Sequence, residues 1–510
     1  MATVQNNMQS LWQATTSPKS FTKLSENLTV DVAVIGAGIT GLTAAYLLAK
    51  AGKKVAVLEA EEVGKGTTGS STGNLYAPID EHLYKVMSKH DESVLKAVVS
   101  SRTEAVNAIE QIVKAFNIDC EFKRVPWYLF ATDSTIAAKI EKERNAAIQA
   151  GLQVAATAPT DFPFKAEAIA NLANQAQFNP YAYIVGLAAA IEGENCRIYE
   201  HTKAEKVEEG EPCVVHTAQG RVNAANVIMA THTPKGIYAV HATMEAYREY
   251  AIAVKLKGNL PAAGIYWHLQ QNHHYSVRPY SNSTGNYLLV LGEPHLVGHK
   301  EHNEESLKKV EAYAREHFDV ESIAFKWAAQ NYKPADLLPY IGTSPLQKNV
   351  FIATGFSADG LVWGTVAANI INDAILKKDN SWAKFFDPKR FTPVASAPKV
   401  VDENIHVVKH LVKDYLFKGD EPELQEIKAG EGKTITLNKE KVAAYRDEQG
   451  ELHVVSSVCT HMGCLVHWNN AEKSWDCPCH GSRFSVDGKI LEGPAFHDLD
   501  NKEIKPDSKQ

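Results

Sequence analysis

Apolar residues near the start of the chain form short runs that predict alternating strands and a helix. After a polar, irregular stretch over residues 1–30, the run Asp31–Ile35 predicts a buried strand. A glycine loop, a predicted helix over Leu42–Ala51 and a second apolar strand over Lys54–Glu59 follow it. Together these segments predict one βαβ unit.

Helical and strand-like periodicities then alternate over longer blocks. A 3.6-residue periodicity predicts helices over Glu92–Phe116 and Thr135–Ala150, whereas short β-like runs dominate residues 178–360. A last long helix is expected over Leu361–Leu376. Further strands are expected at Trp127–Phe130, Val227–Ala230, Ala251–Leu256, Tyr287–Leu291 and Val350–Ala353.

A stretch rich in Pro, Ser and Ala, Pro388–Lys399, marks the best domain boundary. Within the linker 386–427, four apolar residues recur at helical spacing and predict a short amphipathic helix, so we expect a docked linker. These residues are Val408, Leu411, Val412 and Tyr415. Residues 428–510 contain only short strands and turns, which predicts a small all-β domain.

Composition limits the classes of protein to consider. The 510 residues, 45% of them hydrophobic, are enough for two or more cores. The formal net charge of -7, without a long run of one sign, argues against nucleic acid or an anionic membrane as the main partner. The N-terminus lacks a signal-peptide pattern, and the longest apolar region, Val32–Ala49, is too short and Gly-rich for a membrane span. We therefore expect a soluble, cytoplasmic protein.

Seven cysteines are too few for a disulfide scaffold, yet four of them fall within 21 residues, which is typical of a metal site. Two thiolates and two imidazoles would suit a tetrahedral structural zinc, but zinc leaves two cysteines unexplained. A Rieske [2Fe–2S] cluster needs two Cys and two His from two facing loops. The two boxes are Cys459-Thr-His461-Met-Gly-Cys464 and Cys477-Pro-Cys479-His480-Gly-Ser482.

Both boxes resemble the Rieske family over their full length, as Cys-Thr-His-x-Gly-Cys and Cys-Pro-Cys-His-Gly-Ser-x-Phe. The resemblance implies four metal ligands and, although a cytosolic disulfide is unusual, a disulfide that joins the two loops. The implied ligands are Cys459, His461, Cys477 and His480, and the implied disulfide joins Cys464 and Cys479.

Three further positions extend this resemblance. The segment Gly493–Ala495 is similar to the family's proline loop, which covers the cluster. The Ser482 hydroxyl is expected to donate to a cluster sulfur, which raises the reduction potential. Phe484 stands where high-potential members carry Tyr, so one donor is missing and we expect a potential below theirs.

The segment Gly36-Ala-Gly38-Ile-Thr-Gly41 matches G-x-G-x-x-G between a strand and a helix. Such glycines let the backbone approach a pyrophosphate at the helix N-terminus. Glu59, 23 residues after Gly36, ends the second strand, where a carboxylate accepts ribose hydroxyls and repels a 2′-phosphate. This favours FAD or NAD over NADP, with a nucleotide-free turn as the alternative. A second match, Gly64–Gly69, has no apolar strand before it.

Residues 31 to about 380 resemble the FAD-dependent D-amino-acid-oxidase-like family, which includes glycine oxidase, sarcosine oxidase and γ-glutamylputrescine oxidase. The resemblance rests on Gly64–Asn74, Lys203–Val207, Asp336–Gly342 and Ala353–Leu361 in this order. It implies non-covalent FAD, because no cysteine stands near the segment before Gly342. The implied FAD contacts are Gly36, Gly38, Gly41, Glu59, Thr67, Thr72, Gly73, Val207, Gly355, Phe356, Gly360 and Leu361.

The two resemblances together imply the fold. We expect an α/β FAD-binding (Rossmann-like) domain with an interleaved α+β substrate domain carrying a large mixed sheet, plus a small all-β Rieske domain. The expected FAD-binding parts are about 31–105, 185–240 and 325–385, the substrate parts about 106–184 and 241–324, and the Rieske domain 428–510.

The combination implies a function. A flavin accepts two electrons as a hydride and the cluster carries one, so electrons from a small amine or amino acid are expected to pass through the cluster to an external acceptor. A dehydrogenase is favoured over an oxidase, because oxygen would make the cluster redundant. The alternative is an electron-transfer protein reduced by another carrier, with no organic substrate. A Rieske oxygenase is disfavoured, because only 30 residues follow His480, too few for a mononuclear iron domain.

Arg278, within His274–Tyr280, is the candidate for binding a substrate carboxylate bidentately. A surface ion pair is the alternative for this side chain. The pair His273-His274 lacks a nearby acid in the sequence, so a second metal site is not expected.

Overall fold

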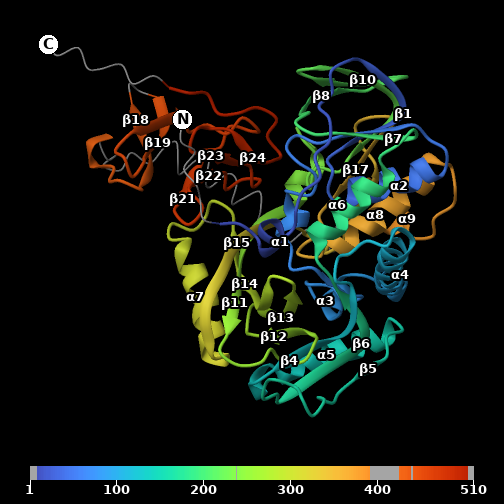
Figure 1. Ribbon diagram of the computed structural model, residues 1–510, viewed down its shortest axis with the longest axis vertical. Coiled ribbons are helices and arrows are strands. Elements are labelled where there is room, and N and C mark those ends of the chain that lie inside the picture. The colour runs from blue at the N-terminus through green and yellow to red at the C-terminus, as the bar shows by residue number, and fades with distance from the viewer. Residues whose placement is uncertain (1–7, 237, 391–423, 438–439, 503–510) are drawn as a thin grey trace.

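A computed structural model describes residues 8–236, 238–390, 424–437 and 440–502 (Figure 1). The amphipathic helix expected around residues 408–415 lies outside these residues. Among the residues described, none of the helices combines the length and apolar character that crossing a bilayer requires.

An eight-stranded sheet contains the predicted βαβ unit. β1 (Leu28–Ile35) pairs in parallel with β2 (Val55–Leu58) and β10 (Gly220–Met229), and α2 (Ile39–Lys50) connects β1 to β2. The strand order is β16-β17-β10-β1-β2-β7, with β9 paired to β10 and β8 to β9. The other strands are β7 (Cys196–Tyr199), β8 (Ala204–Glu208), β9 (Cys213–Thr217), β16 (Tyr340–Thr343) and β17 (Val350–Thr354).

A nine-stranded mixed sheet has the order β15-β11-β14-β13-β12-β4-β6-β3, with β5 paired to β6. Only β4 and β12 pair in parallel among its described ladders, and the other pairs are antiparallel. Its strands are β3 (Asn74–Leu75), β4 (Lys123–Ala131), β5 (Val154–Ala155), β6 (Ala168–Gln177), β11 (Met244–Leu256), β12 (Ile265–Leu269), β13 (His274–Asn282), β14 (Gly285–Leu296) and β15 (Val320–Pro334).

The long predicted helices are confirmed as α4 (Glu92–Phe116), α5 (Ser134–Gln149) and α8 (Gly360–Ile375). Two helices were missed inside the block 178–360, α6 (Pro180–Ile191) and α7 (Glu304–His317). Their start signals are present: Asn179 caps α6 before a Pro, and two glutamates open α7. The remaining helical segments are α3 (Leu83–Lys89), α9 (Ala383–Phe386), η1 (Thr67–Ser70), η2 (Ala239–Thr243) and η3 (Leu424–Glu426).

The irregular stretch expected over residues 1–30 is partly wrong. A short helix, α1 (Leu11–Thr15), begins at the capping side chain of Ser10, and β1 starts at Leu28. Leu11 and Trp12 are fully buried, and the Trp12 indole donates to the carbonyl oxygen of Ser71 at 2.6 Å. The N-terminal segment therefore packs on the loop that follows β2.

The C-terminal domain holds two small antiparallel sheets and forms its own lobe at the end of β15 (Figure 1). One sheet contains β18 (Gly432–Leu437), β19 (Glu440–Arg446) and β20 (Leu452–Ser456). The other contains β21 (His467–Asn469), β22 (Ser474–Asp476), β23 (Arg483–Ser485) and β24 (Ile490–Glu492). The expected fold class is thus confirmed in all three of its parts.

Candidate redox sites

The first glycine loop makes a close turn that side chains would block. Gly36 has φ +103°, and a Cβ on Gly41 would lie 1.9 Å from the carbonyl oxygen of Gly36. The Glu59 carboxylate accepts the backbone N–H groups of Ala37 at 2.8 Å and Glu61 at 3.0 Å, and burial raises its pKa. The backbone at the start of α2 is free of side chains that would block a pyrophosphate, and the adjacent Glu59 carboxylate suits the ribose. This arrangement fits a dinucleotide.

The loop after β2 is fixed against the nine-stranded sheet. The Thr67 hydroxyl lies 3.1 Å from Nδ1 of His232, and the Trp327 indole donates to the carbonyl oxygen of Ser70 at 2.8 Å. The Arg278 guanidinium donates through Nη1 to the carbonyl oxygens of Thr72 at 2.6 Å and Gly73 at 2.9 Å. Thr67, Thr72 and Gly73 are therefore held in one ordered loop.

Arg278 is 2% exposed, so the alternative of a surface ion pair is wrong. Burial lowers its pKa to about 9, and its guanidinium lies 5.3 Å from the Trp12 ring centroid. These contacts hold the loop after β2 in place. Binding of a substrate carboxylate by Arg278 stays a prediction.

The segment before α8 closes the same region. Gly355 has φ +76°, and the Ser357 N–H donates to the carbonyl oxygen of Tyr332 at 2.9 Å. Asp359, the N-cap residue of α8, accepts the Tyr76 hydroxyl at 2.6 Å, and burial raises its pKa to about 6. The predicted contacts Gly355, Phe356, Gly360 and Leu361 all belong to this segment.

Val207 lies in β8, where it pairs with Val215. The backbone contacts with the Glu59 segment are made instead by His201 and Thr202, whose N–H groups donate to the carbonyl oxygens of Glu61 and Glu59. A contact of Val207 with FAD stays a prediction.

The two C-terminal boxes form facing loops. Cys464 and Cys479 are joined by a disulfide, as the resemblance implies. The rings of His461 and His480 have centroids 4.9 Å apart, and Nδ1 of His480 is buried without a partner in the described part of the chain. A hydrogen bond with the Cys477 thiol lowers the pKa of Cys459 to about 7. Two close thiols and two close imidazoles, one with an unused ring nitrogen, fit a [2Fe–2S] cluster.

The histidine edge of this site faces the segment that follows β10. Nε2 of His461 donates to the carbonyl oxygen of Gly236 at 3.2 Å, and the Gly236 N–H donates to the carbonyl oxygen of Pro494 at 3.0 Å. The His241 ring lies 5.1 Å from that of His461 between centroids. Both implied histidine ligands are less than a tenth exposed.

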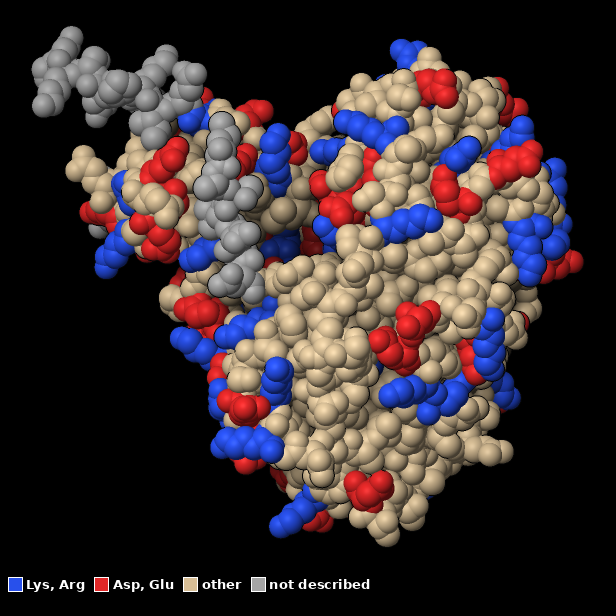
Figure 2. All heavy atoms as spheres, in the orientation of Figure 1, with Lys and Arg blue, Asp and Glu red and all other residues tan. Residues whose placement is uncertain are grey.

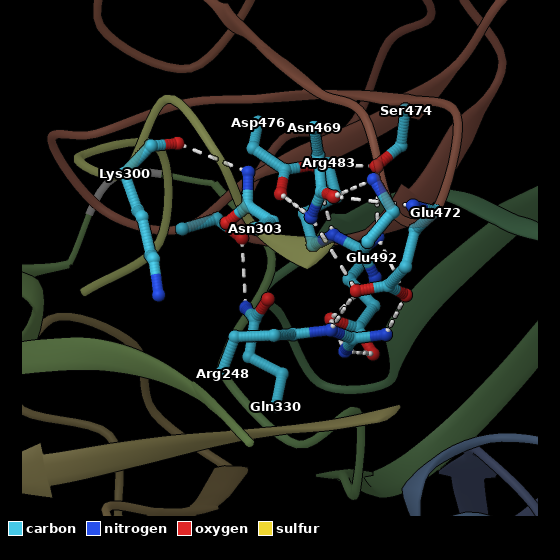
Figure 3. Close-up of polar contacts among 12 residues, drawn as sticks. Arg248, Lys300, Asn303, Gln330, Asn469, Glu472, Ser474, Asp476, Arg483 and Glu492 are labelled. Carbon is cyan, nitrogen blue, oxygen red and sulfur yellow. Dashed lines mark hydrogen bonds and ion pairs between the residues drawn. The ribbon is translucent and has the colours of Figure 1, made fainter. Parts of the chain in front are cut away.

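A buried charge network joins the two parts (Figure 3). Nε of Arg248 on β11 donates to Glu472 at 2.7 Å, and Arg248 pairs with Glu492 at 3.3 Å. Arg483 pairs with Glu472 at 2.9 Å and with Asp476 at 2.9 Å. Burial opposes the charge of Glu472, but the two arginines hold its pKa at about 2. The network therefore stays ionised and fixes the C-terminal domain on β11.

Two side chains of β15 also contact the C-terminal domain. Gln330 donates to the carbonyl oxygen of Gly481 at 2.8 Å, and the Tyr332 hydroxyl donates to that of Gly493 at 2.6 Å. These residues and Arg248 were not predicted from the sequence. The only signal in the sequence was a charged or polar residue within an apolar strand, and such a residue does not indicate which distant residue it contacts.

Two family models match the chain: "FAD dependent oxidoreductase" over residues 31–374 and "Rieske [2Fe-2S] domain" over residues 421–503. The chain belongs to the FAD-dependent oxidoreductase family and carries a C-terminal Rieske domain. These domains imply an FAD and a [2Fe–2S] cluster, and decide against the zinc and nucleotide-free alternatives.

Relatives repeat this architecture in whole or in part. YhfW of Bacillus subtilis (strain 168), which carries the name of a Rieske 2Fe-2S iron-sulfur protein, is 34% identical over 96% of this chain and 97% of its own. Gamma-glutamylputrescine oxidoreductase of Escherichia coli (strain K12) is 28% identical over 41% of this chain and 50% of its own. Glycine oxidase of Geobacillus kaustophilus shares the fold with TM-score 0.60 at 17% identity, covering 71% of this chain and 99% of its own.

Proposed function

We propose that the protein is an FAD-dependent dehydrogenase that oxidises a small amine or amino acid and passes the electrons singly through its Rieske cluster to an external acceptor. When bound, FAD takes a hydride from the substrate and the cluster takes one electron at a time. The observation that carries the proposal is the contact of His461 with Gly236, which turns the implied outer ligand of the cluster toward the flavin-binding part.

The residues have separate tasks in this proposal. The glycines of the first loop and Glu59 hold the dinucleotide, Gly64–Asn74 and the start of α8 surround the ring, and two Cys and two His hold the cluster. The proposed cluster ligands are Cys459, His461, Cys477 and His480.

Tyr332 supports direct passage between the two sites. Its backbone carbonyl oxygen accepts the N–H of Ser357, beside the proposed flavin ring site, and its hydroxyl donates to Gly493, in the loop beside the cluster. One residue thus bridges both sites, and burial of the interface excludes water from it. This favours the cluster as the outlet over direct reaction with oxygen.

The external acceptor needs another approach, because His461 and His480 face inward. Met462, in the first cluster box, is 53% exposed. We assign the approach of the acceptor to this side of the cluster. Acidic and basic side chains are interspersed over the face in Figure 2, which gives no single sign of charge to a partner. A cytoplasmic location belongs to this proposal as well.

The names of similar proteins support a nitrogen-containing substrate. They include gamma-glutamylputrescine oxidoreductase, glycine oxidase and L-proline dehydrogenase. The alternative, an electron carrier without an organic substrate, would be reduced by another redox protein.

Anaerobic mixing of the holoprotein with a panel of amines and amino acids tests the function. We expect at least one compound to bleach the flavin and then to produce the EPR signal of a reduced Rieske cluster. The proposal fails if no compound bleaches the flavin while a reduced ferredoxin or NAD(P)H does.

A further inference from the structure

β11 and β15 present alternate residues to opposite sides of the nine-stranded sheet. Arg248, paired with Gln330, faces the C-terminal domain. The residues between point the other way, toward the loop after β2, as Trp327 shows by its hydrogen bond to Ser70. The polar residues on this inner face include Glu245, Tyr247, Glu249, Asn331 and Lys333.

The cations of this inner face are already paired. Nζ of Lys333 lies 2.8 Å from the Glu81 carboxylate and 3.5 Å from that of Asp80. Arg102 pairs with Asp359 at 3.4 Å. Burial lowers the pKa of His274 to about 4, so this ring is neutral at pH 7 and adds no charge.

Glu249 forms no ion pair within the described part of the chain, although the charge of Lys333, which pairs with Glu81 and Asp80, attracts it. Its side chain is 7% exposed, and within the described ranges it makes neither a hydrogen bond nor an ion pair. Burial and the nearby charge of Asp80 raise its pKa to about 7. A buried carboxylate without a partner is unfavourable, so its retention needs a reason.

Asn331 provides an independent observation at the same place. It is 5% exposed, and its Oδ1 has no hydrogen-bond donor in the described part of the chain. Asn331 pairs with Tyr247 across β11 and β15, two residues from the pair that contains Glu249, so both acceptors share one face. Pro334, at the end of β15, lies against Gly355 before α8.

We propose that Glu249 and Asn331 bind an ammonium group of the substrate, so that the site takes an aliphatic amine and not an acid held by its carboxylate. An ammonium offers three donors and no acceptor, which matches two unpartnered acceptors and a local excess of acids. A carboxylate would meet Glu249, Asp80 and Asp359, while Nη1 of Arg278 is engaged by carbonyl oxygens. This inference rests on the proposed function, because it names the substrate class of the same site.

Calorimetric titration of the oxidised holoprotein with butylammonium and with butyrate, which have four-carbon chains and opposite charge, tests the inference. We expect butylammonium to bind and butyrate not to bind. Glu249→Gln should weaken butylammonium binding about 10- to 100-fold, because a charge-assisted contact is lost. Asn331→Leu should weaken it less. Glu321→Gln, a neutralised acid at an exposed position of β15, is the matched control and should bind normally.

The inference is overturned if butyrate binds in preference, if butylammonium does not bind, or if Glu249→Gln binds it as the native protein does. Flavin bleaching separates this failure from that of the function. Bleaching by α-amino acids and not by simple amines would overturn the amine specificity and leave the dehydrogenase standing. Bleaching by neither class would overturn the dehydrogenase, while the titration still decides whether Glu249 binds a cation.

Discussion

The carbonyl oxygen of Gly236 accepts a hydrogen bond from Nε2 of His461 at 3.2 Å. Gly236 lies on the segment that leaves β10, where the Ala230 N–H donates to Ile35, next to the first glycine loop. His232, between them, contacts Thr67 in the loop after β2. A single short backbone segment therefore lies beside the first glycine loop and contacts both the loop after β2 and the implied cluster ligand His461.

Removing the charge of Arg248 should weaken the docking of the two parts. Arg248→Met leaves Glu472 and Glu492 buried with fewer cations, and loss of one partner from a buried network costs about 3–5 kcal/mol. We expect a lower unfolding midpoint of the C-terminal domain, and slower cluster reduction after an unchanged flavin reduction in stopped-flow experiments.

Arg315→Met on α7 is the control for this change, because Arg315 pairs with Glu311 at the surface, where an ion pair contributes under about 1 kcal/mol. It should leave both rates unchanged. Normal cluster reduction in Arg248→Met would show that this network does not position the cluster.

Gly41→Ala should abolish retention of FAD. The added Cβ would lie 1.9 Å from the Gly36 carbonyl oxygen, so the turn that exposes the loop backbone must open. Gly193→Ala meets no atom within 4 Å and serves as the control. The flavin-to-protein ratio after gel filtration measures the effect, and a full complement of FAD in Gly41→Ala would contradict the assignment of this loop.

The sequence predicted those features whose determinants lie close together along the chain. The βαβ unit and the cluster boxes each lie within 30 residues, and α4 carries a clear helical period over its 25 residues. Helices α6 and α7 were missed because apolar β-like runs surround them, although the sequence contains residues that typically begin a helix at both positions.

The contacts of β11 with the C-terminal domain, and the cluster of acidic residues around Glu249, join residues that are far apart in the sequence. Arg248 and Glu472 are 224 positions apart. Asp80, the partner of Lys333 on β15, lies far away in the sequence, between β3 and α3. The periodicity of β11 shows that its residues alternate between two faces. It does not show what covers each face, so neither Glu249 nor Tyr332 could be assigned from the sequence.

Glu249→Gln should change the pH dependence of stability. The pKa of Glu249 is raised from 4.5 to about 7 in the folded protein, so the folded state binds more protons between these values and stability falls as pH rises through this range. The variant should match the native protein near pH 5 and exceed it by roughly 1–3 kcal/mol at pH 8. Urea unfolding of both proteins at the two pH values measures this difference. Equal free energies of unfolding at pH 8 would show that the ionised Glu249 carboxylate does not destabilise the folded protein.

The Cys464–Cys479 disulfide should protect the cluster and not create it. It closes a loop with a sequence separation of 15, for which chain entropy gives about 3 kcal/mol. The double variant Cys464→Ala/Cys479→Ala should assemble the cluster but lose its visible absorbance faster on warming. If the variant never contains iron, the two cysteines are needed as metal ligands. If its visible absorbance disappears on warming at the same rate as in the native protein, the disulfide does not protect the cluster.

The central claim is tested most directly by rapid anaerobic mixing of the holoprotein with an amine that reduces its flavin. Absorbance monitors the flavin, and freeze-quench EPR monitors the cluster. We expect the cluster to become reduced after the flavin at a rate that stays constant over a tenfold range of protein concentration, because the electrons pass within one chain. A rate proportional to protein concentration, or a cluster that stays oxidised beside a bleached flavin, would contradict transfer across the interface of His461 and Gly236.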